Sequence, residues 1–416
     1  MMVRRRGFLK GTLAAGVSVA ALKAPAVLAQ AAPIKLGMLT VQSGPLAQAG
    51  YQMSQGIGIF LKQRNGTLAG RKIELVTADT GGNPAAAKTK LIELVERDHV
   101  DIVLGPFAAF ELLAITDYVR SNQIPLITTA TAEDITQRQR NPWIVRTSSS
   151  SAQTPHVMAD YCAKELKLKI MATIANDFSF GHEQCAGFQR VFEDDGGKIV
   201  IKLWPPLVTP DYVPYISQLT EIDGIFNGLG GGNPVRFLQT YASLGLTRKT
   251  TMAGGWSLLD EPLLRSLGDE AVGIYTAHWY TPSYASASNA VFTAAMQSDH
   301  GELPGGGAAG MYVAGQVIEA ALQKTSGRLD DKQKFMAAML AVELTDTPRG
   351  PFHFDSLGNA VGPVFIRRCE RDNGKLVNKV IKTYPNVSQF WTYDQNWFLS
   401  EPVYSRNYPP ARNLRS

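Results

Sequence analysis

The residue types that usually carry catalysis or bind metals form no complete motif in this sequence. Gly228 and Gly230 follow an apolar run as in a dinucleotide-binding loop, but Asn233 occupies the third glycine position. His182-Glu183 starts a zinc-protease pattern that lacks its second histidine. The sequence has no Gly-Lys-Ser/Thr phosphate loop and no Gly-x-Ser-x-Gly nucleophile elbow. We therefore expect neither enzymatic activity nor a bound metal or cofactor.

The cysteines and histidines are too scattered to predict a metal site. The six histidines and three cysteines show no ligand spacing. Cys162, Cys185 and Cys369 are a sparse and odd set, which does not make a disulfide framework. Two interpretations stay open for Cys162 and Cys185: a bridge, if two neighbouring helices bring them together, or a pair of buried free thiols.

Small polar groups at three turns suit the binding of a carboxylate. These turns directly follow apolar segments and read Ser43-Gly44-Pro45, Phe107-Ala108-Ala109-Phe110 and Thr129-Ala130-Thr131. Free backbone N–H groups and hydroxyls beside a helix N-terminus favour anions. Thr129 and Thr131 have a second interpretation, in which they only cap the end of a strand.

Strands that alternate with helices must position these turns. A strand begins at Ile34, helix 46–64 follows it, and Asn83-Pro84 starts another helix as cap and first-turn residue. Strands separated by helices indicate a parallel sheet with helices on both faces, and ligands of such sheets bind at the carboxyl ends of the strands. The other elements expected here are strands 72–77, 102–104 and 125–129 and helix 108–121.

The same pattern restarts after residues 146–151, which predicts a second α/β unit. Beyond Tyr275 the sequence is less regular, with a hairpin expected over 349–359 and an irregular tail over 384–416. The elements expected after residue 151 are strands 170–174, 198–203, 222–227 and 250–253 and helices 155–166, 182–195, 234–244, 308–323 and 331–343.

The first 31 residues have the pattern of a twin-arginine export signal. Arg5-Arg6 precede Phe8-Leu9-Lys10, a weakly apolar stretch runs from Gly11 to Leu22, and small residues follow near Ala29. The alternative is a basic amphipathic first helix. The apolar stretch is shorter than the roughly 20 residues that cross a membrane. We therefore expect residues 1–31 to be a cleaved signal, a periplasmic location, and no direct membrane insertion of the mature protein.

Size, composition and charge narrow the functional classes. About 385 residues remain after residue 31, which is more than one ordinary core and predicts two domains. The chain is 45% hydrophobic and 19% charged, as in globular proteins. Its formal charge is +5, and residues 4–6, 10 and 23 supply five positive charges, so the mature protein is near neutral. Without a basic stripe, nucleic acid is not an expected partner.

An ordered set of segments resembles the branched-chain-amino-acid-type substrate-binding proteins of ABC importers. The resemblance runs through the whole mature chain, in Ile34–Leu39 with Ser43–Leu46, Gly70–Leu75, Asp101–Pro106, Ile124–Ile127, Val145–Thr147 and Arg349–Phe352. It implies an α/β fold: a two-lobed clamshell of periplasmic-binding-protein type I, in which each lobe is a mostly parallel sheet flanked by helices and three hinge crossings connect the lobes. It also implies that lobe one comprises residues 32–147 plus 280–352, and lobe two 148–279 plus 353–416.

The tail segment Tyr384–Tyr393 is similar to a branch of this family whose members often bind aromatic or other organic acids. In the family, the three turns identified above hold the ligand carboxylate. The ligand-binding residues that the resemblance implies are Ser43, Tyr51, Phe107, Ala108, Ala109, Phe110, Thr129, Ala130, Thr131, Phe178, Phe180, Gly230, Gly255, Trp256, His278 and Tyr280. Phe180 also fits as a core residue, and the cluster 278–284 also fits as hinge packing.

The segment Gly254–Ser257 differs from amino-acid binders of this family, which usually carry an acidic residue here. The next acids are Asp260 and Glu261. A buried ammonium without a counter-charge is costly, so we expect a ligand without an α-amino group. Trp256 and the phenylalanines predict an aromatic pocket. On this interpretation, Trp256→Ala and Thr131→Ala should both weaken ligand binding.

These observations predict the solute-binding component of an ABC importer. We expect a monomer that captures a small organic carboxylate, such as a benzoate, phenylpropanoid or aryl-oxo acid, and delivers it to an inner-membrane permease. A branched-chain or other amino acid is the alternative ligand. Two other classes are a ligand sensor for a membrane receptor and an exported enzyme, since twin-arginine export often carries cofactor proteins.

Overall fold

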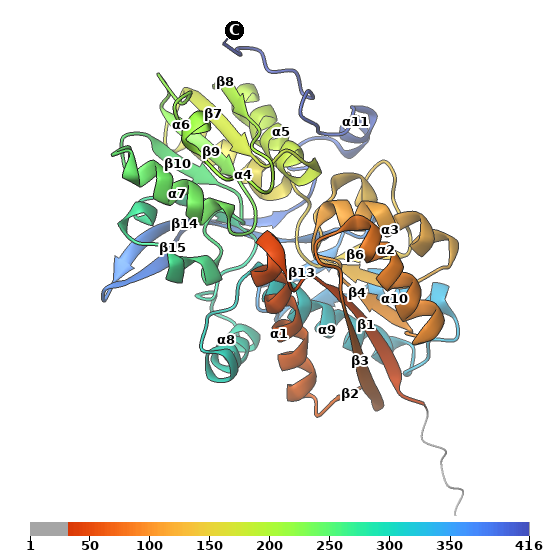
Figure 1. The fold of residues 1–416 in the computed structure, drawn as a ribbon. Helices are drawn as coiled ribbons and strands as arrows, with labels where there is room; N and C mark the ends of the chain where they lie inside the picture. The colour runs from red at the N-terminus through yellow and green to blue at the C-terminus, as the bar shows by residue number, and fades with distance from the viewer. Residues whose placement is uncertain (1–31, 416) are drawn as a thin grey trace, which may run out of the picture. The chain divides into compact units, whose positions relative to one another are not determined.

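The computed structural model describes residues 32–415, and the predicted export signal lies outside this range. The first of its two sheets has six strands in the order β2-β3-β1-β4-β5-β6, parallel except for the β2–β3 pair (Figure 1). Its central pairing aligns Leu36 of β1 with Leu75 of β3 and with Ile102 of β4. The strands are β1 Ile34–Thr40, β2 Thr67–Leu68, β3 Arg71–Asp79, β4 Ile102–Leu104, β5 Leu126–Thr128 and β6 Ile144–Arg146.

Helices cover both faces of the first sheet. Along the sheet, the step from β1 to β3 runs in one direction, and the steps from β3 to β4 and from β4 to β5 run in the opposite direction. Because the crossovers between parallel strands are right-handed, α1 lies on one face of the sheet and α2 and α3 lie on the other. Accordingly α1 packs on α9, and α2 packs on α3. The Asn83 side chain caps α2 as predicted, by accepting the N–H groups of Ala85 and Ala86. These helices are α1 Ala47–Gln63, α2 Pro84–Ile92, α3 Ala109–Ser121, α8 Ala287–His300, α9 Gly306–Lys324 and α10 Lys332–Leu340.

The second sheet has nine strands in the order β12-β13-β14-β11-β10-β9-β7-β8, with β15 paired to β14. Its β7 to β11 part is parallel, whereas β12 to β15 join antiparallel. The strands are β7 Ile170–Ala175, β8 Lys198–Leu203, β9 Gly224–Gly228, β10 Thr251–Gly254, β11 Tyr275–His278, β12 Glu343–Leu344, β13 Phe352–Phe354, β14 Ala360–Asp372 and β15 Lys375–Val387. The helices after β6 and among these strands are α4 Gln153–Lys164, α5 Ser179–Asp194, α6 Val213–Ile216, α7 Asn233–Ser243 and α11 Gln395–Ser400.

The structure confirms the predicted α/β class and the two sheets with flanking helices; the first sheet is mostly parallel, whereas the second has as many antiparallel as parallel strand pairs. Several elements after residue 275 were not predicted. The predicted irregular tail begins inside β15 and contains α11, and β11, α8 and most of the β14–β15 hairpin were not predicted. The hairpin is difficult to recognise because β14 begins with an uninterrupted buried run, which lacks the alternation of a half-buried strand. In α8 the buried positions are few, so its helical period is weak.

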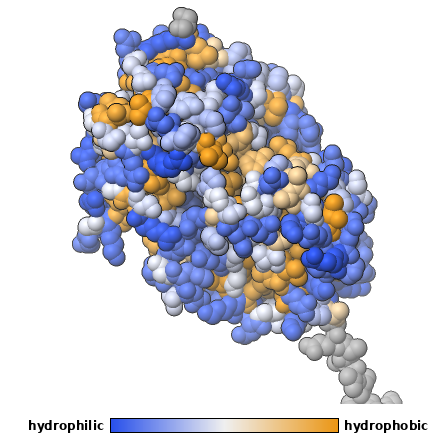
Figure 2. Space-filling view, viewed as in Figure 1, coloured by the Kyte–Doolittle hydropathy of each residue, from blue (hydrophilic) through white to orange (hydrophobic). Residues whose placement is uncertain are grey.

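The core holds all three cysteines. Cys162, Cys185 and Cys369 are buried free thiols, so the described residues contain no disulfide and the free-thiol interpretation holds. On the face shown in Figure 2, hydrophilic residues cover most of the surface and hydrophobic patches appear between them. Within residues 32–415, none of the helices combines the length and the hydropathy needed to cross a membrane.

Candidate functional site

Each sheet has a topological switch point, where neighbouring strands lead to opposite sides. In the first sheet this point lies between β1 and β4, and in the second between β7 and β9. The loops after such strands diverge and leave a crevice at the carboxyl edge of the sheet, which is the usual ligand position in open α/β sheets. The four loops concerned are those after Thr40, Leu104, Ala175 and Gly228.

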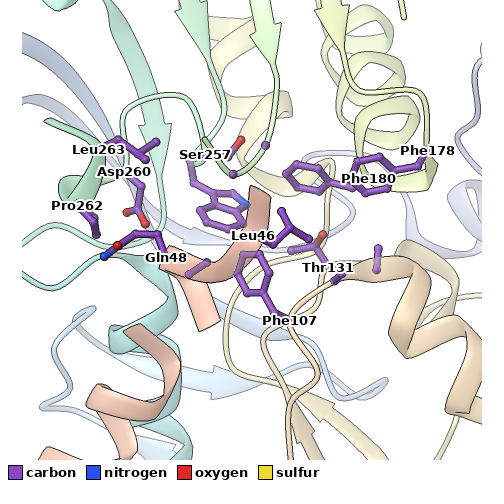
Figure 3. Close-up of a pocket in the computed structure, with 16 residues that line it drawn as sticks. Leu46, Gln48, Phe107, Thr131, Phe178, Phe180, Ser257, Asp260, Pro262 and Leu263 are labelled. Atoms are coloured by element: carbon purple, nitrogen blue, oxygen red, sulfur yellow. The ribbon is translucent and has the colours of Figure 1, made fainter. Parts of the chain in front are cut away.

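One pocket is lined by residues from all four of these loops, together with the loops after β5 and β10 (Figure 3). The cavity that they enclose has a volume of about 60 Å³. The lining residues are Leu46, Gln48, Ala49, Phe107, Ala108, Ala109, Thr131, Phe178, Phe180, Gly230, Gly231, Trp256, Ser257, Asp260, Pro262 and Leu263.

Half of the residues expected to bind ligand line this pocket. They come from five separate places in the sequence, and the fold brings them around a single cavity. They are Phe107, Ala108, Ala109, Thr131, Phe178, Phe180, Gly230 and Trp256.

The N-terminus of α3 contributes free backbone donors beside the pocket. The first N–H groups of a helix have no partner within it. The Ala108 N–H is accepted by the buried Glu111 carboxylate at 3.1 Å, which leaves the N–H groups of Ala109 and Phe110 at the helix end. Burial raises the pKa of Glu111. A ligand carboxylate at this place would receive hydrogen bonds and the favourable end of the helix dipole.

Thr131 is held in the pocket wall by buried hydrogen bonds on both sides of it. The Arg146 guanidinium donates from Nε to the Ala130 carbonyl at 2.8 Å and from Nη2 to the Ala132 carbonyl. Ser151 Oγ donates to the carbonyl and to the hydroxyl oxygen of Thr131, both at 2.9 Å. Burial lowers the pKa of Arg146 to about 10, so the guanidinium stays charged at neutral pH. The Thr131 side chain is thereby fixed where it lines the pocket.

Aromatic rings form the middle of the pocket wall. Trp256 contacts Phe107 and Phe180 edge-to-face, with ring centroids 6.2 and 6.1 Å apart. Phe178 stacks on Phe180 at 6.0 Å. The Trp256 indole N–H is buried and has no acceptor within the described part of the chain. Such a wall favours a flat apolar ring, through burial and through edge-to-face contact.

Five expected residues from the first-sheet side lie outside the lining. Ser43 is exposed at the end of the first loop, and half-exposed Tyr51 donates its hydroxyl to the Gln42 carbonyl at 3.0 Å. Thr129 is buried, with its hydroxyl directed to the sulfur of Met53 at 3.6 Å, and the strand end is instead capped by Thr128 Oγ1, which accepts the Ala130 N–H at 2.9 Å. The other two are Ala130, whose carbonyl accepts Arg146, and Phe110, which packs edge-to-face on Phe178 at 5.5 Å.

Three expected residues near the second sheet also lie behind the wall. Gly255 lies against the side chain of Gln184, whose Oε1 would be 2.4 Å from an added Cβ. His278 and Tyr280 are fully buried, and the Tyr280 hydroxyl donates to Asn289 Oδ1 at 3.1 Å. Neither His278 nor Tyr280 is among the residues that line the pocket.

The sequence-based argument that the site lacks an acid needs correction. Asp260 lines the pocket, four residues after Trp256, with Ser257, Pro262 and Leu263 beside it. Asp260 was not expected in the site because it lies beyond the segment 254–257. The loop after β10 brings it back to the cavity. The other lining residues that were not predicted are Leu46, Gln48, Ala49 and Gly231, and all except Gln48 are apolar or have no side chain.

The glycine-rich loop after β9 approaches the first sheet closely. Gly231 has a φ of +60°, and an added Cβ would lie 2.3 Å from the Pro45 carbonyl oxygen. Gly232 donates its N–H to the same oxygen at 3.1 Å. The glycines therefore allow backbone-to-backbone contact at one edge of the pocket.

Behind the pocket, two buried carboxyl groups meet. Glu183 of α5 accepts the backbone N–H of Glu133 at 3.4 Å, and Glu133 accepts the Ala152 N–H at 2.7 Å. Burial raises the pKa of both acids, and the Glu133 charge adds to the rise at Glu183, whereas Arg146 opposes it.

A sequence profile and a curated relative match most of the chain. The profile of the family described as periplasmic binding protein matches residues 33–375. The Leu/Ile/Val-binding protein homolog 6 of Brucella melitensis is 26% identical over 382 residues, which covers 88% of this chain and 95% of the relative.

Two solved structures from Rhodopseudomonas palustris are similar over nearly their whole length. The solute binding protein of an ABC transporter from strain BisB5, in complex with 3,4-dihydroxybenzoic acid, has a TM-score of 0.82 and 31% identity, and covers 86% of this chain and 98% of its own. The one from strain HaA2, in complex with p-hydroxybenzoic acid, has a TM-score of 0.81 and 26% identity with the same coverage.

Proposed function

Because this chain belongs to the periplasmic binding protein family, we propose that it is the solute-binding component of an ABC importer and captures a small aromatic carboxylate. The proposed lobes are residues 32–147 plus 280–352 and 148–279 plus 353–416. Ligand contacts to both lobes would stabilise the closed form, which is a shift of population toward the state that delivers ligand to a permease.

The observation that carries the choice of ligand is the pocket at the two switch points. It combines the free N–H groups of α3 and the Thr131 hydroxyl with a wall of aromatic rings, and its lining includes no lysine or arginine from residues 32–415. Backbone donors and a hydroxyl suffice for one carboxylate, and the rings suit a flat apolar body. The benzoic acids bound by the two Rhodopseudomonas proteins have this chemistry.

A branched-chain amino acid is the second candidate, favoured by the Leu/Ile/Val-binding relative. Its ammonium would need an acid close to the carboxylate site, because both groups sit on one carbon atom. Figure 3 shows Asp260 on the other side of the pocket from Thr131, with Phe107 between them. This separation favours a ligand whose polar groups are held apart by a ring.

The cellular setting is proposed from the sequence pattern. Residues 1–31 would direct export by the twin-arginine route, and the mature protein would act as a periplasmic monomer with an inner-membrane permease as its partner. Neither direct membrane insertion nor nucleic-acid binding belongs to this proposal.

A thermal unfolding screen tests the choice of ligand. A ligand that binds the native state at a concentration 100 times its Kd adds about 2.7 kcal/mol to the free energy of unfolding. We expect benzoate, 4-hydroxybenzoate or phenylpyruvate to raise the unfolding temperature and leucine to leave it unchanged. A rise with leucine alone would contradict the proposal.

A further inference from the structure

Among residues 32–415, Asp260 is the only ionisable side chain that lines the pocket. The other fifteen lining residues are apolar, lack a side chain, or carry a neutral amide, hydroxyl or indole. The Asp260 side chain is 13% exposed, so it is largely removed from solvent and yet reaches the cavity. A carboxylate in this position must be explained by a structural role, a ligand role or both.

The structural role of Asp260 uses only part of its capacity to accept hydrogen bonds. Gly306 at the N-terminus of α9 donates its N–H to Oδ1 at 3.0 Å and to Oδ2 at 3.2 Å. His278 Nε2 lies 3.1 Å from Oδ1. A carboxylate has about four acceptor positions. The two shorter contacts, from Gly306 and His278, are therefore on Oδ1. Oδ2 has only the 3.2 Å contact from Gly306 and keeps one free acceptor position.

The histidine beside Asp260 is a neutral donor. Its Nδ1 accepts the Tyr280 N–H at 2.9 Å, so the ring hydrogen is on Nε2 and is donated to Asp260. Burial lowers the pKa of His278 to about 4, which keeps the ring neutral at pH 7. Among residues 32–415, no arginine or lysine forms an ion pair with Asp260, and Arg367 pairs with Glu261 at 2.9 Å. The Asp260 charge is thus stabilised by neutral donors and the α9 N-terminus.

The pocket has two polar ends separated by aromatic rings. Asp260 and Gln48 lie together at one side of the view in Figure 3, and Thr131 with Phe178 and Phe180 lies at the other. Gln48 is already engaged, since its Oε1 accepts Arg265 at 3.1 Å and its Nε2 faces Glu302 at 3.4 Å. Asp260 is therefore the charged acceptor at this end.

We propose that Asp260 accepts a hydrogen bond from a ring hydroxyl at the end of the ligand remote from its carboxylate, and so selects hydroxylated over unsubstituted aromatic acids. The inference rests on the proposed function, in which the carboxylate lies at the α3 N-terminus. An apolar ring end would leave the buried carboxylate without its solvent partners, which costs binding energy. A ring hydroxyl at the same place would donate a hydrogen bond to the carboxylate and so replace these solvent partners.

The test compares benzoate, 4-fluorobenzoate and 4-hydroxybenzoate by calorimetric titration of the wild-type protein and Asp260→Asn. Fluorine is close to a hydroxyl in size and donates no hydrogen. Because a hydrogen bond to a charged group is strong, wild type should bind 4-hydroxybenzoate about tenfold or more tighter than 4-fluorobenzoate. In Asp260→Asn this ratio should fall to about threefold or less, because the acceptor has lost its charge.

Asp331→Asn is the matched control. Asp331 also caps a helix, α10, by accepting the Lys334 N–H at 2.9 Å, and it lies outside the pocket lining. Its substitution should leave all three affinities unchanged. If wild type bound the three acids with equal affinity, or if Asp260→Asn kept the wild-type ratio of affinities for 4-hydroxybenzoate and 4-fluorobenzoate, the role of Asp260 would be overturned while the proposed function would stand. Absence of binding by every one of them would instead overturn the proposed function on which it rests.

Discussion

Ala109→Pro is the substitution that tests the carboxylate position most selectively. Ala109 is the first residue of α3, where proline is well tolerated because its missing N–H is not needed within the helix. The preceding Ala108 has φ −85° and ψ 142°, which is the extended conformation that proline requires of its neighbour. The change therefore removes one N–H from the proposed site with little cost to folding.

The expected loss follows from the strength of the hydrogen bond that is removed. A hydrogen bond to a charged group contributes about 1.5–3 kcal/mol, which corresponds to roughly 10- to 150-fold in Kd. The proline ring also occupies space where the N–H pointed, so we expect the larger part of this range. Calorimetric titration with 4-hydroxybenzoate measures the loss, and thermal unfolding without ligand shows whether the fold is retained.

Ala287→Pro serves as the control for this experiment. Ala287 is the exposed first residue of α8, and Ser286 before it is also extended, with φ −136° and ψ 154°. It should unfold at nearly the wild-type temperature and bind ligand with wild-type affinity. If Ala109→Pro bound 4-hydroxybenzoate within about twofold of wild type, the ligand carboxylate would not lie at the α3 N-terminus, and the reasoning would be refuted.

Three further substitutions test other parts of the account. Thr131→Val keeps the shape of the side chain but removes its hydroxyl, and should weaken 4-hydroxybenzoate binding about tenfold in calorimetry; wild-type affinity would remove Thr131 from the site. Trp256→Ala removes a ring face worth about 2 kcal/mol of contact and should weaken the same binding roughly thirtyfold, whereas unchanged affinity would exclude Trp256. Burial and the Glu133 charge raise the pKa of Glu183 in the folded state, so its contribution to stability is present below pH 4.5 and is lost as pH rises through the folded value. The unfolding temperature of Glu183→Gln should therefore rise relative to that of wild type between pH 5 and pH 8. Glu74 is exposed, and Glu74→Gln is the control whose unfolding temperature should show no such rise.

Local patterns in the sequence predicted that Phe107, Ala108, Ala109 and Thr131 lie at the ends of first-sheet strands, where they line the pocket, but did not predict Leu46, Gln48 or Ala49. The strand at residues 102–104 and the helix after it were both recognisable, so the position of Ala108 and Ala109 at a helix N-terminus followed from element order. On the second sheet, the strand and the helix on either side of Phe178 and Phe180 were likewise recognisable, which placed these two residues in the loop after β7. Short buried strands flanked by amphipathic helices carry this signal in a window of a few residues.

The acidic end of the pocket could not be predicted in this way. Asp260 reaches the cavity because Gly306, distant in the sequence, brings the N-terminus of α9 to its carboxylate. Gln48 is likewise held by Glu302 and Arg265. These are long-range contacts between irregular loops, and hydrophobic periodicity contains no information about them. The one available signal was Asp260 itself, the next acid after Trp256.

The central claim is that the pocket binds an aromatic carboxylate, and a calorimetric titration tests it directly. The protein without residues 1–31 would be purified, freed of carried-over ligand by unfolding and refolding, and titrated with 4-hydroxybenzoate and with leucine at pH 7. The account predicts saturable one-to-one binding of 4-hydroxybenzoate and no heat of binding with leucine. Saturable binding of leucine without a response to 4-hydroxybenzoate would contradict it.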